Sequence, residues 1–177
     1  GLVPMTDFNG RSIWTTKPSE AEVEARRLAY HAPYHVALSA EIARVKALHS
    51  VAILYDCHSI RSNIPFLFDG MLPVFNIGDN NGATCDPRLT RLVAEKCETS
   101  AFSAVTNGRF KGGWTTRNYG DPANGVQAIQ MEMAQRVYMN EAPLWDYRTD
   151  LADQVRPVLS DIFQSIVQFA DELKRVP

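Results

Sequence analysis

Residues 51–59 have the sequence Val-Ala-Ile-Leu-Tyr-Asp-Cys-His-Ser. The first five are apolar or aromatic and rich in strand-forming side chains, and they follow a segment with helical spacing. A short apolar run after a helix is typical of a buried strand in an α/β sheet. Open α/β sheets bind ligands beyond the carboxyl ends of their strands. The stretch therefore predicts an α/β fold with a functional site near Asp56 and His58.

Helix start signals lie on both sides of this strand. Ser19 and Glu22 have the spacing of a capping box, which predicts a helix beginning at Ser19. Asp86 before Pro87 is a strong N-cap pair and predicts a second helix. Pro33 predicts a kink or break in the first helix near Ala32. The other expectations are strands at 73–77, 102–106 and 126–133, a short helix at 133–140, and a C-terminal amphipathic helix over 151–173 whose start is set by Pro157.

The composition predicts one globular domain covering residues 1–177. Hydrophobic residues make up 45% and charged residues 21%, and the net charge is −2. This charge argues against binding to nucleic acid or to a membrane surface, both of which usually need a basic excess. No apolar run approaches the roughly 18 residues of a membrane helix. Three widely spaced cysteines without a CxxC pattern favour a reduced, cytoplasmic setting.

Two residues are candidates for chemistry. His58 at a strand end can ligate zinc through one nitrogen while a carboxylate such as Asp56 orients the other. Taken alone, it is more often a partly buried histidine bonded to its neighbours, because a catalytic zinc needs three protein ligands. Glu132 lies among Met, Ile and Val, where burial would raise its pKa and make it a general base. A carboxylate facing solvent or paired with an arginine is an equally good reading of that position.

Three loop arginines could recognise an anionic substrate. Arg61, Arg109 and Arg117 follow predicted strands, and a guanidinium group can hold a carboxylate through two parallel hydrogen bonds. The alternative is that these three arginines lie on the surface and serve only to keep the protein soluble. The run Asn-Gly-Arg-Phe-Lys-Gly-Gly at 107–113 has three glycines and two cations and could hold an anion through its backbone, but it lacks P-loop spacing and no clear helix follows it.

Several runs together resemble the N-formylglutamate amidohydrolases. They occur in consistent order over nearly the whole chain, which makes the set far more specific than any one member. The runs are Pro-Tyr-His (33–35), Asp-Cys-His-Ser-Ile-Arg-Ser (56–62), Phe-Asp-Gly (68–70), Asn-Gly-Ala-Thr-Cys-Asp-Pro (81–87), Asn-Gly-Arg-Phe-Lys-Gly-Gly (107–113), Thr-Arg-Asn-Tyr-Gly (116–120), Gln-Met-Glu-Met (130–133) and Tyr-Met-Asn-Glu (138–141).

The resemblance implies a zinc hydrolase with a carboxypeptidase-like, three-layer αβα fold. Its substrate would be a small dicarboxylate, N-formyl-L-glutamate, cleaved to formate and glutamate at the end of a histidine degradation route. In that family His58 resembles the third zinc ligand, and Glu132 resembles the carboxylate that activates water. The residues that resemble clamps for the substrate carboxylates are Arg61, Asn107, Arg109 and Arg117.

Three departures from the family pattern shape the expectations. The other zinc ligands of the family lie in an N-terminal segment that this chain lacks, so we expect an incomplete fold, little zinc on this chain and an unpaired sheet edge that invites a second copy. Asn118 and Gln127 stand where histidines are expected, and with Asp56 they are candidate neighbours of the site. Two alternatives follow, namely a different N-acyl amino acid substrate or a non-catalytic domain.

Overall fold

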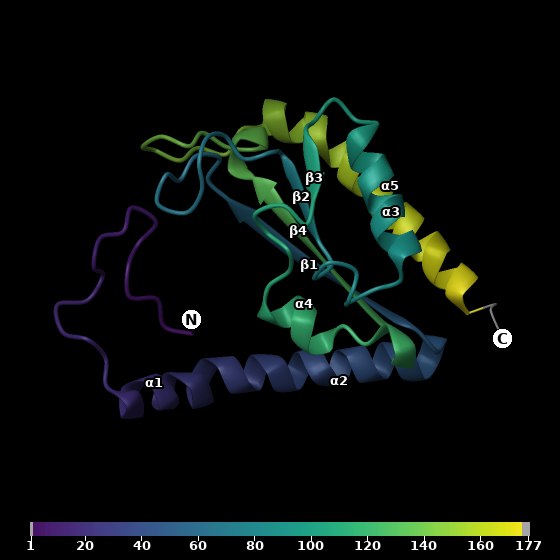
Figure 1. The fold of residues 1–177 in the computed structure, drawn as a ribbon, viewed down its shortest axis with the longest axis horizontal. Coiled ribbons are helices and arrows are strands. Elements are labelled where there is room, and N and C mark those ends of the chain that lie inside the picture. The colour runs from purple at the N-terminus through teal and green to yellow at the C-terminus, as the bar shows by residue number, and fades with distance from the viewer. Residues whose placement is uncertain (1, 175–177) are drawn as a thin grey trace.

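The structure, a computed structural model, describes residues 2–174 and has a mixed α/β fold built on a four-stranded sheet (Figure 1). The strands lie in the order β1-β4-β2-β3. β1 runs parallel to β4, β2 runs antiparallel to β4, and β3 runs parallel to β2. The strands are β1 (Ala52–Ile60), β2 (Phe75–Gly78), β3 (Ala104–Thr106) and β4 (Val126–Ala134).

Helices cover both faces of the sheet. α2 and α4 lie on one face, and α3 and α5 lie on the other (Figure 1). Within residues 2–174, no helix is both long and apolar enough to cross a membrane. The helices are α1 (Glu20–Arg26), α2 (Ala32–His49), α3 (Pro87–Glu98), α4 (Trp114–Tyr119) and α5 (Thr149–Leu173), with a π-helical turn at Arg27–His31 and 3-10 turns at Pro122–Asn124 and Gln135–Val137.

β1 is longer than the sequence predicts. The expected strand ended at residue 55 and left Asp56 and His58 beyond it, but the strand continues to Ile60. The physical reason is β4, which also has nine residues and pairs with β1 along its whole length, from Ala52 opposite Val126 to Ile60 opposite Ala134. Asp56 and His58 therefore sit within the strand.

The main core lies between the sheet and the α3/α5 layer. Side chains on alternate positions of a strand face the same side, and the apolar set of β4, Ile129 and Met131, faces this layer. Asp86 caps α3 by accepting a hydrogen bond from the Arg88 backbone N–H, as its sequence predicts. The core includes Phe75, Ile77, Leu89, Val93, Ile129, Met131, Val155, Ile162 and Phe169.

The first two helices form one nearly continuous rod. Ser19 caps α1 by accepting from the Glu22 N–H at 3.2 Å, which confirms the predicted start. The break expected near Ala32 is replaced by a π-helical turn, in which the Ala32 N–H donates to the Arg27 carbonyl five residues back. Since Pro33 has no N–H to donate, this wider turn adjusts the backbone without ending the rod.

Two other helix predictions fail in part. Of residues 133–140, only the 3-10 turn Gln135–Val137 is helical. Residues 138–148 instead fold back on themselves through a Met139–Tyr147 bridge and an Arg148 N–H bond to the Tyr138 carbonyl. Pro157 lies inside α5 and does not begin it. Buried residues on both sides of Pro157, such as Val155 and Ile162, pack into one core, and this packing outweighs one missing helical hydrogen bond.

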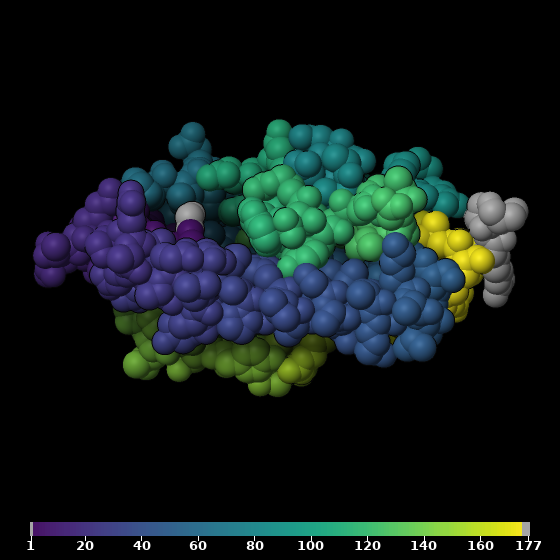
Figure 2. All heavy atoms as spheres, turned by 90° about the horizontal axis from the view of Figure 1, so that it is seen from below, coloured from purple at the N-terminus to yellow at the C-terminus, as the bar shows by residue number. Residues whose placement is uncertain are grey.

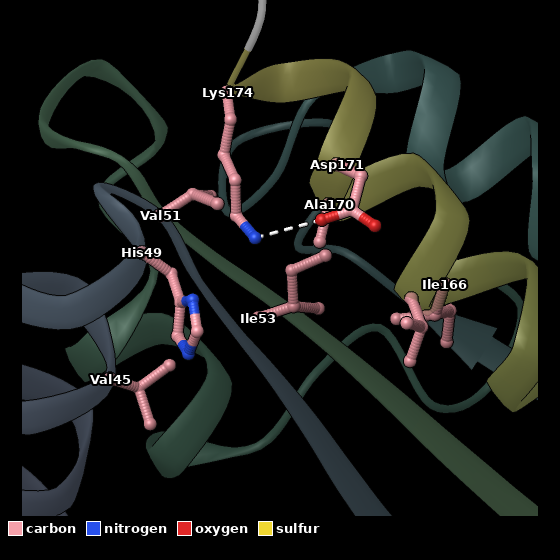
Figure 3. Close-up of a pocket in the computed structure, with 9 residues that line it drawn as sticks. Val45, His49, Val51, Ile53, Ile166, Ala170, Asp171 and Lys174 are labelled. Atoms are coloured by element: carbon pink, nitrogen blue, oxygen red, sulfur yellow. Dashed lines mark hydrogen bonds and ion pairs between the residues drawn. The ribbon is translucent and has the colours of Figure 1, made fainter.

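The α1–α2 rod leaves much apolar surface exposed. It runs along one face of the molecule beside α4 (Figure 2), and α2 contains no buried residue. A groove of about 390 Å³ opens where the end of α2 meets β1 and α5, lined mainly by apolar side chains such as Val45, Ile53 and Ile166 (Figure 3).

The outer edge of β1 pairs with no described residue. Pairing with a second copy there remains a prediction.

A buried carboxylate fastens the two loops that approach the sheet after β2 and β3. Asp79 accepts hydrogen bonds from the Thr90 hydroxyl at 2.6 Å, the Asn107 side-chain amide at 2.6 Å and the Gly82 N–H at 2.8 Å. Gly78 lets the loops approach closely, since an added Cβ would lie 2.5 Å from the Gly112 nitrogen. The position of residues 107–113 therefore depends on Asp79.

Replacing Asp79 tests this network. Burial opposes ionisation, yet the three hydrogen bonds hold the pKa of Asp79 below its ordinary value. A depressed pKa stabilises the fold above the ordinary pKa and loses that effect as pH falls through the folded value. We expect Asp79→Asn to lower the free energy of unfolding by about 1–3 kcal/mol near neutral pH. In urea titrations this difference should narrow below pH 3.8.

The control is Asp153→Asn at an exposed position of α5. It should change the free energy of unfolding by less than about 0.5 kcal/mol. A difference between wild type and Asp79→Asn that persists unchanged into acid would contradict the role of the ionised carboxylate.

The core is tested on α5. Ile162 is fully buried, whereas Val167 on the same helix is 63% exposed. Ile162→Ala should lower the free energy of unfolding by about 2–5 kcal/mol, because it removes buried methyl groups and leaves a cavity. Val167→Ala should cost under about 0.5 kcal/mol in the same denaturant titration. Similar losses for the two variants would rule out this assignment of the core.

Candidate functional site

Four polar side chains come together on the face of the sheet that carries α4. Asp56 pairs with Gln130, and His58 pairs with Glu132, in the parallel register of β1 and β4. Residues two apart on a strand share a face, and partners in a parallel register face the same way. The pairing therefore places all four side chains on one side of the sheet, and it brings together the histidine and the glutamate that the sequence singles out.

Asp56 orients His58. The His58 Nε2 lies 3.0 Å from Asp56 Oδ1, and the Thr116 hydroxyl of α4 donates to Asp56 Oδ2 at 3.4 Å. The hydrogen bond that the His58 ring donates to Asp56 raises the pKa of His58, with burial acting against it and the charges of Asp56 and Glu132 adding to it. The sequence expectation that a carboxylate would hold this imidazole is met by Asp56.

Glu132 is a buried acid. It is 7% exposed, and burial raises its pKa; the charge of Asp56 acts in the same direction, while His58 acts against both. The fully buried Asn76 of β2 donates its amide to the Glu132 backbone carbonyl at 3.0 Å. A carboxylate with a raised pKa on a fixed strand has the properties of a general base or acid.

Cations surround a cavity of about 560 Å³ in front of this acid. His58, Gln130 and Glu132 form part of its wall, and Arg109, Lys111, Phe110 and Arg117 form much of the rest. Arg109 donates to the Leu67 carbonyl at 3.0 Å, and Arg117 donates to the Gly112 carbonyl. Within residues 2–174, none of Arg109, Lys111 and Arg117 forms an ion pair with a carboxylate. The cavity thus presents positive charge to a ligand.

Two of the predicted clamps lie elsewhere. The Asn107 side chain is hydrogen-bonded within the Asp79 loop. It donates to the Asp79 carboxylate and accepts from the backbone N–H groups of Asp79 and Asn81. Arg61 donates to the Asn9 side chain at 3.2 Å. Neither lines the cavity. The structure therefore brings Arg109 and Arg117 to the site, while Asn107 positions the loop that carries Arg109.

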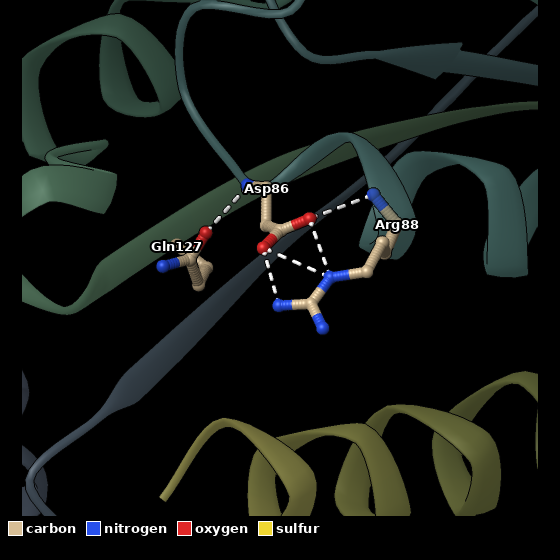
Figure 4. A network of polar contacts seen from close by, with 3 residues as sticks. All are labelled: Asp86, Arg88 and Gln127. Atoms are coloured by element: carbon tan, nitrogen blue, oxygen red, sulfur yellow. Dashed lines mark hydrogen bonds and ion pairs between the residues drawn. The ribbon is translucent and has the colours of Figure 1, made fainter. Parts of the chain in front are cut away.

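Gln127 and Asn118 also stand apart from the cavity. Gln127 lies an odd number of residues from Glu132 along β4, so it faces the opposite side of the sheet. There its side-chain oxygen accepts from the Asp86 N–H at 2.6 Å, next to the Asp86–Arg88 ion pair (Figure 4). Asn118 is exposed on α4. Of the three candidate neighbours of the site, Asp56 is the one that bonds to a side chain of the cavity wall, His58.

Lys111 and Gln130 also line the cavity, although the sequence marked them only within the runs 107–113 and 130–133 and not as site residues. Gln130 accepts a hydrogen bond from the Gly113 N–H and so ties the start of α4 to β4. Its spacing of two residues from Glu132 was the available signal, because residues i and i+2 share a strand face. Lys111 was marked only as one of the two cations of the run 107–113. The short helix α4 contradicts the expectation that no clear helix follows that run.

The described residues do not complete a metal site. A catalytic zinc usually has three protein ligands, and residues 2–174 contain no group of three His, Cys, Asp or Glu side chains placed to hold a metal ion. His58 could supply one ligand, since Asp56 already orients its ring. The donor set present therefore fits part of a zinc site only.

The sequence matches the family described as N-formylglutamate amidohydrolase over residues 1–139. Two curated relatives are named N-formylglutamate deformylase. The one from Pseudomonas aeruginosa is 47% identical over 176 residues, and the one from Pseudomonas putida is 43% identical over 175 residues. Each alignment covers 97% of this chain and 66% of the relative, so the chain spans just under two thirds of their length.

A solved structure supports the fold. The crystal structure of N-formylglutamate amidohydrolase from Ralstonia eutropha JMP134 superposes with a TM-score of 0.77 at 23% identity, covering 96% of this chain and 62% of that one. At this identity the likeness concerns the fold alone. The family match extends over most of the chain, including the strands that carry His58 and Glu132. The chain belongs to the N-formylglutamate amidohydrolase family.

Proposed function

We propose that this chain forms part of the active site of a deformylase that hydrolyses the formyl amide of N-formyl-L-glutamate to formate and L-glutamate. The observation that carries the proposal is the cavity in which His58 and Glu132 face Arg109, Lys111 and Arg117. The family relatives named N-formylglutamate deformylase support the same reaction. In metabolism this reaction would close a histidine degradation route.

The charge of the cavity suits a dicarboxylate. N-formylglutamate carries two carboxylates at neutral pH, and the cavity offers three cations that no carboxylate of residues 2–174 neutralises. Arginine holds a carboxylate through a planar fork of two N–H groups, whereas lysine acts as a compact charge. Arg109, Lys111 and Arg117 would bind the two carboxylates and leave the formyl group to face Glu132.

Glu132 would handle the proton of the reaction. As a carboxylate it takes a proton from the attacking water while the water oxygen bonds to the formyl carbon. It then gives the proton to the departing amino nitrogen as the C–N bond breaks. Burial favours this exchange because the raised pKa of Glu132 lies closer to neutral pH. His58 lies opposite Glu132 in the strand register, and Asp56 holds the His58 ring at 3.0 Å.

Zinc enters the proposal only because the N-formylglutamate amidohydrolase family implies it. His58 would be one ligand, and the others would have to come from outside residues 2–174, since those residues hold no complete donor set. A carboxypeptidase-like arrangement of the complete domain belongs to the same proposal. The steps described for Glu132 and for the three cations depend only on this chain's own side chains.

No observation favours either alternative. Asn118 and Gln127, which suggested a different N-acyl amino acid, do not line the cavity. A non-catalytic domain would have no need for a buried acid that faces unpaired cations. Both alternatives are outcomes of the experiments that follow.

Glu132→Gln tests the proton transfer. Glutamine keeps the shape of Glu132 but cannot take up a proton near neutral pH. Formate release from N-formyl-L-glutamate by the natural protein should fall about 10²- to 10⁴-fold in kcat with little change in KM. The control Glu98→Gln, at the exposed end of α3, should keep wild-type rates. Absence of formate release from folded, zinc-loaded wild type would refute the proposed function itself.

Lys111→Gln tests the recognition of the second carboxylate. N-formyl-L-glutamine lacks the side-chain carboxylate of N-formyl-L-glutamate, so it should be insensitive to the loss of this cation. The preference for N-formylglutamate in kcat/KM should fall about 10- to 100-fold, from about 1.5–3 kcal/mol for a hydrogen bond to a charged group. Lys17→Gln, on the exposed N-terminal segment, is the matched control. Equal losses for both substrates would show that Lys111 does not read that carboxylate.

A further inference from the structure

A second cavity, of about 670 Å³, lies beside α4 where α4 meets the α1–α2 rod. Its wall includes His31, His35, Trp114, Thr115 and Arg117. Arg117 also lines the cavity of His58 and Glu132, so this one side chain separates the two spaces. The remaining lining residues are Leu2 and Arg27.

The polar groups of this cavity are donors and cations, with no acidic side chain among its lining residues. Arg27 is already paired with Glu24, its Nε lying 2.8 Å from a carboxylate oxygen. Arg117 has no such partner within residues 2–174, and its guanidinium group donates to the Gly112 carbonyl. The uncompensated charge at this wall is therefore that of Arg117, next to the hydroxyl of Thr115.

The two histidines form a compact pair. They lie one helical turn apart, and their ring centroids are 4.1 Å apart. The His35 Nδ1 lies 2.7 Å from the Tyr119 hydroxyl, which in turn donates to the His35 carbonyl at 3.3 Å. When the Tyr119 hydroxyl gives its proton to the His35 carbonyl, Nδ1 carries the hydrogen of the 2.7 Å contact. Nε2 is then the nitrogen of His35 that gains or loses a proton.

We propose that this cavity binds a carboxylate group between Arg117 and the His31–His35 pair, and that binding is coupled to uptake of a proton by His35. The choice of a carboxylate over other anions rests on the proposed function, whose substrate and products carry carboxylates and whose cavity shares Arg117. Trp114 packs against both imidazoles, with centroid distances of 5.6 and 4.7 Å, and supplies an aromatic wall for the carbon chain of such a ligand.

The charges around His35 give the sign of the coupling. Without a ligand, burial and the charge of His31 lower the pKa of His35. The other charged groups near the pair are Arg27 with its partner Glu24, and Arg117, while Tyr119 presents a hydroxyl. A bound carboxylate would offset this positive surround and raise the pKa of His35. Affinity should therefore increase as pH falls.

NMR titration of the histidine rings in the natural protein tests the proposal without requiring turnover. Glutarate is the probe, at constant ionic strength. It should raise the pKa of His35 and bind about tenfold more tightly near pH 5.5 than near pH 7.5. The ring signals of His49, which lies at the far end of α2, should not move. Movement of His58 signals alone would place the ligand only in the other cavity and overturn the proposal, as would no movement at all.

Variants separate the contributions. His35→Asn keeps an amide donor for Tyr119 but removes the titrating nitrogen, so glutarate binding should lose its pH dependence while the fold is retained. Arg117→Gln should weaken binding about tenfold or more, and Arg44→Gln, on the exposed face of α2, should not. A response to inorganic phosphate but not to glutarate would overturn the choice of a carboxylate. Binding with no formate release would refute the proposed hydrolysis only.

Discussion

The parallel register of β1 and β4 is the constraint on which the rest of the structure depends. It places His58 opposite Glu132 and Asp56 opposite Gln130. Polar side chains from two distant parts of the chain therefore lie together on one face of the sheet. A shift of one residue would turn every side chain of one strand to the opposite face. The apolar residues of β4 would then leave the core at the same time as Glu132 left the site, so stability and site geometry select the same register.

The two faces of the sheet differ in character, since one carries the apolar core and the other carries the cavity. The face under α3 and α5 is mostly apolar and carries the main core, which holds both long strands in place. The opposite face carries buried polar groups, which α4 and the 107–113 loop partly cover. Burial on that face raises the pKa of Glu132. Asp79 lies beyond the end of β2, where hydrogen bonds from residues such as Thr90 of α3 hold its pKa low. The raised pKa suits Glu132 to the proton transfer proposed for it, and Asp79 fixes the loop that brings Arg109 and Lys111 to the cavity.

α4 connects the features of the polar face. Thr116 reaches Asp56, Gly113 at its start is bound by Gln130, and Trp114 and Tyr119 contact His35 on the α1–α2 rod. Arg117 lies on the same helix and borders both cavities. A helix of this length is held by its contacts and not by its own propensity. Changes on the exposed rod could therefore reach the site through α4.

The sequence by itself determined the elements whose signals are local, namely the caps at Ser19 and Asp86, the apolar run of β1 and the alternating run of β4, and it marked His58 and Glu132 as the candidates for chemistry. Its ordered motifs also gave the family. Only the tertiary structure decided that β1 continues through His58, that Pro157 lies within a helix, and that Lys111 joins the cavity while Asn107 and Gln127 do not. Those outcomes depend on pairing and packing between residues far apart in the chain, and such contacts outweigh local propensity.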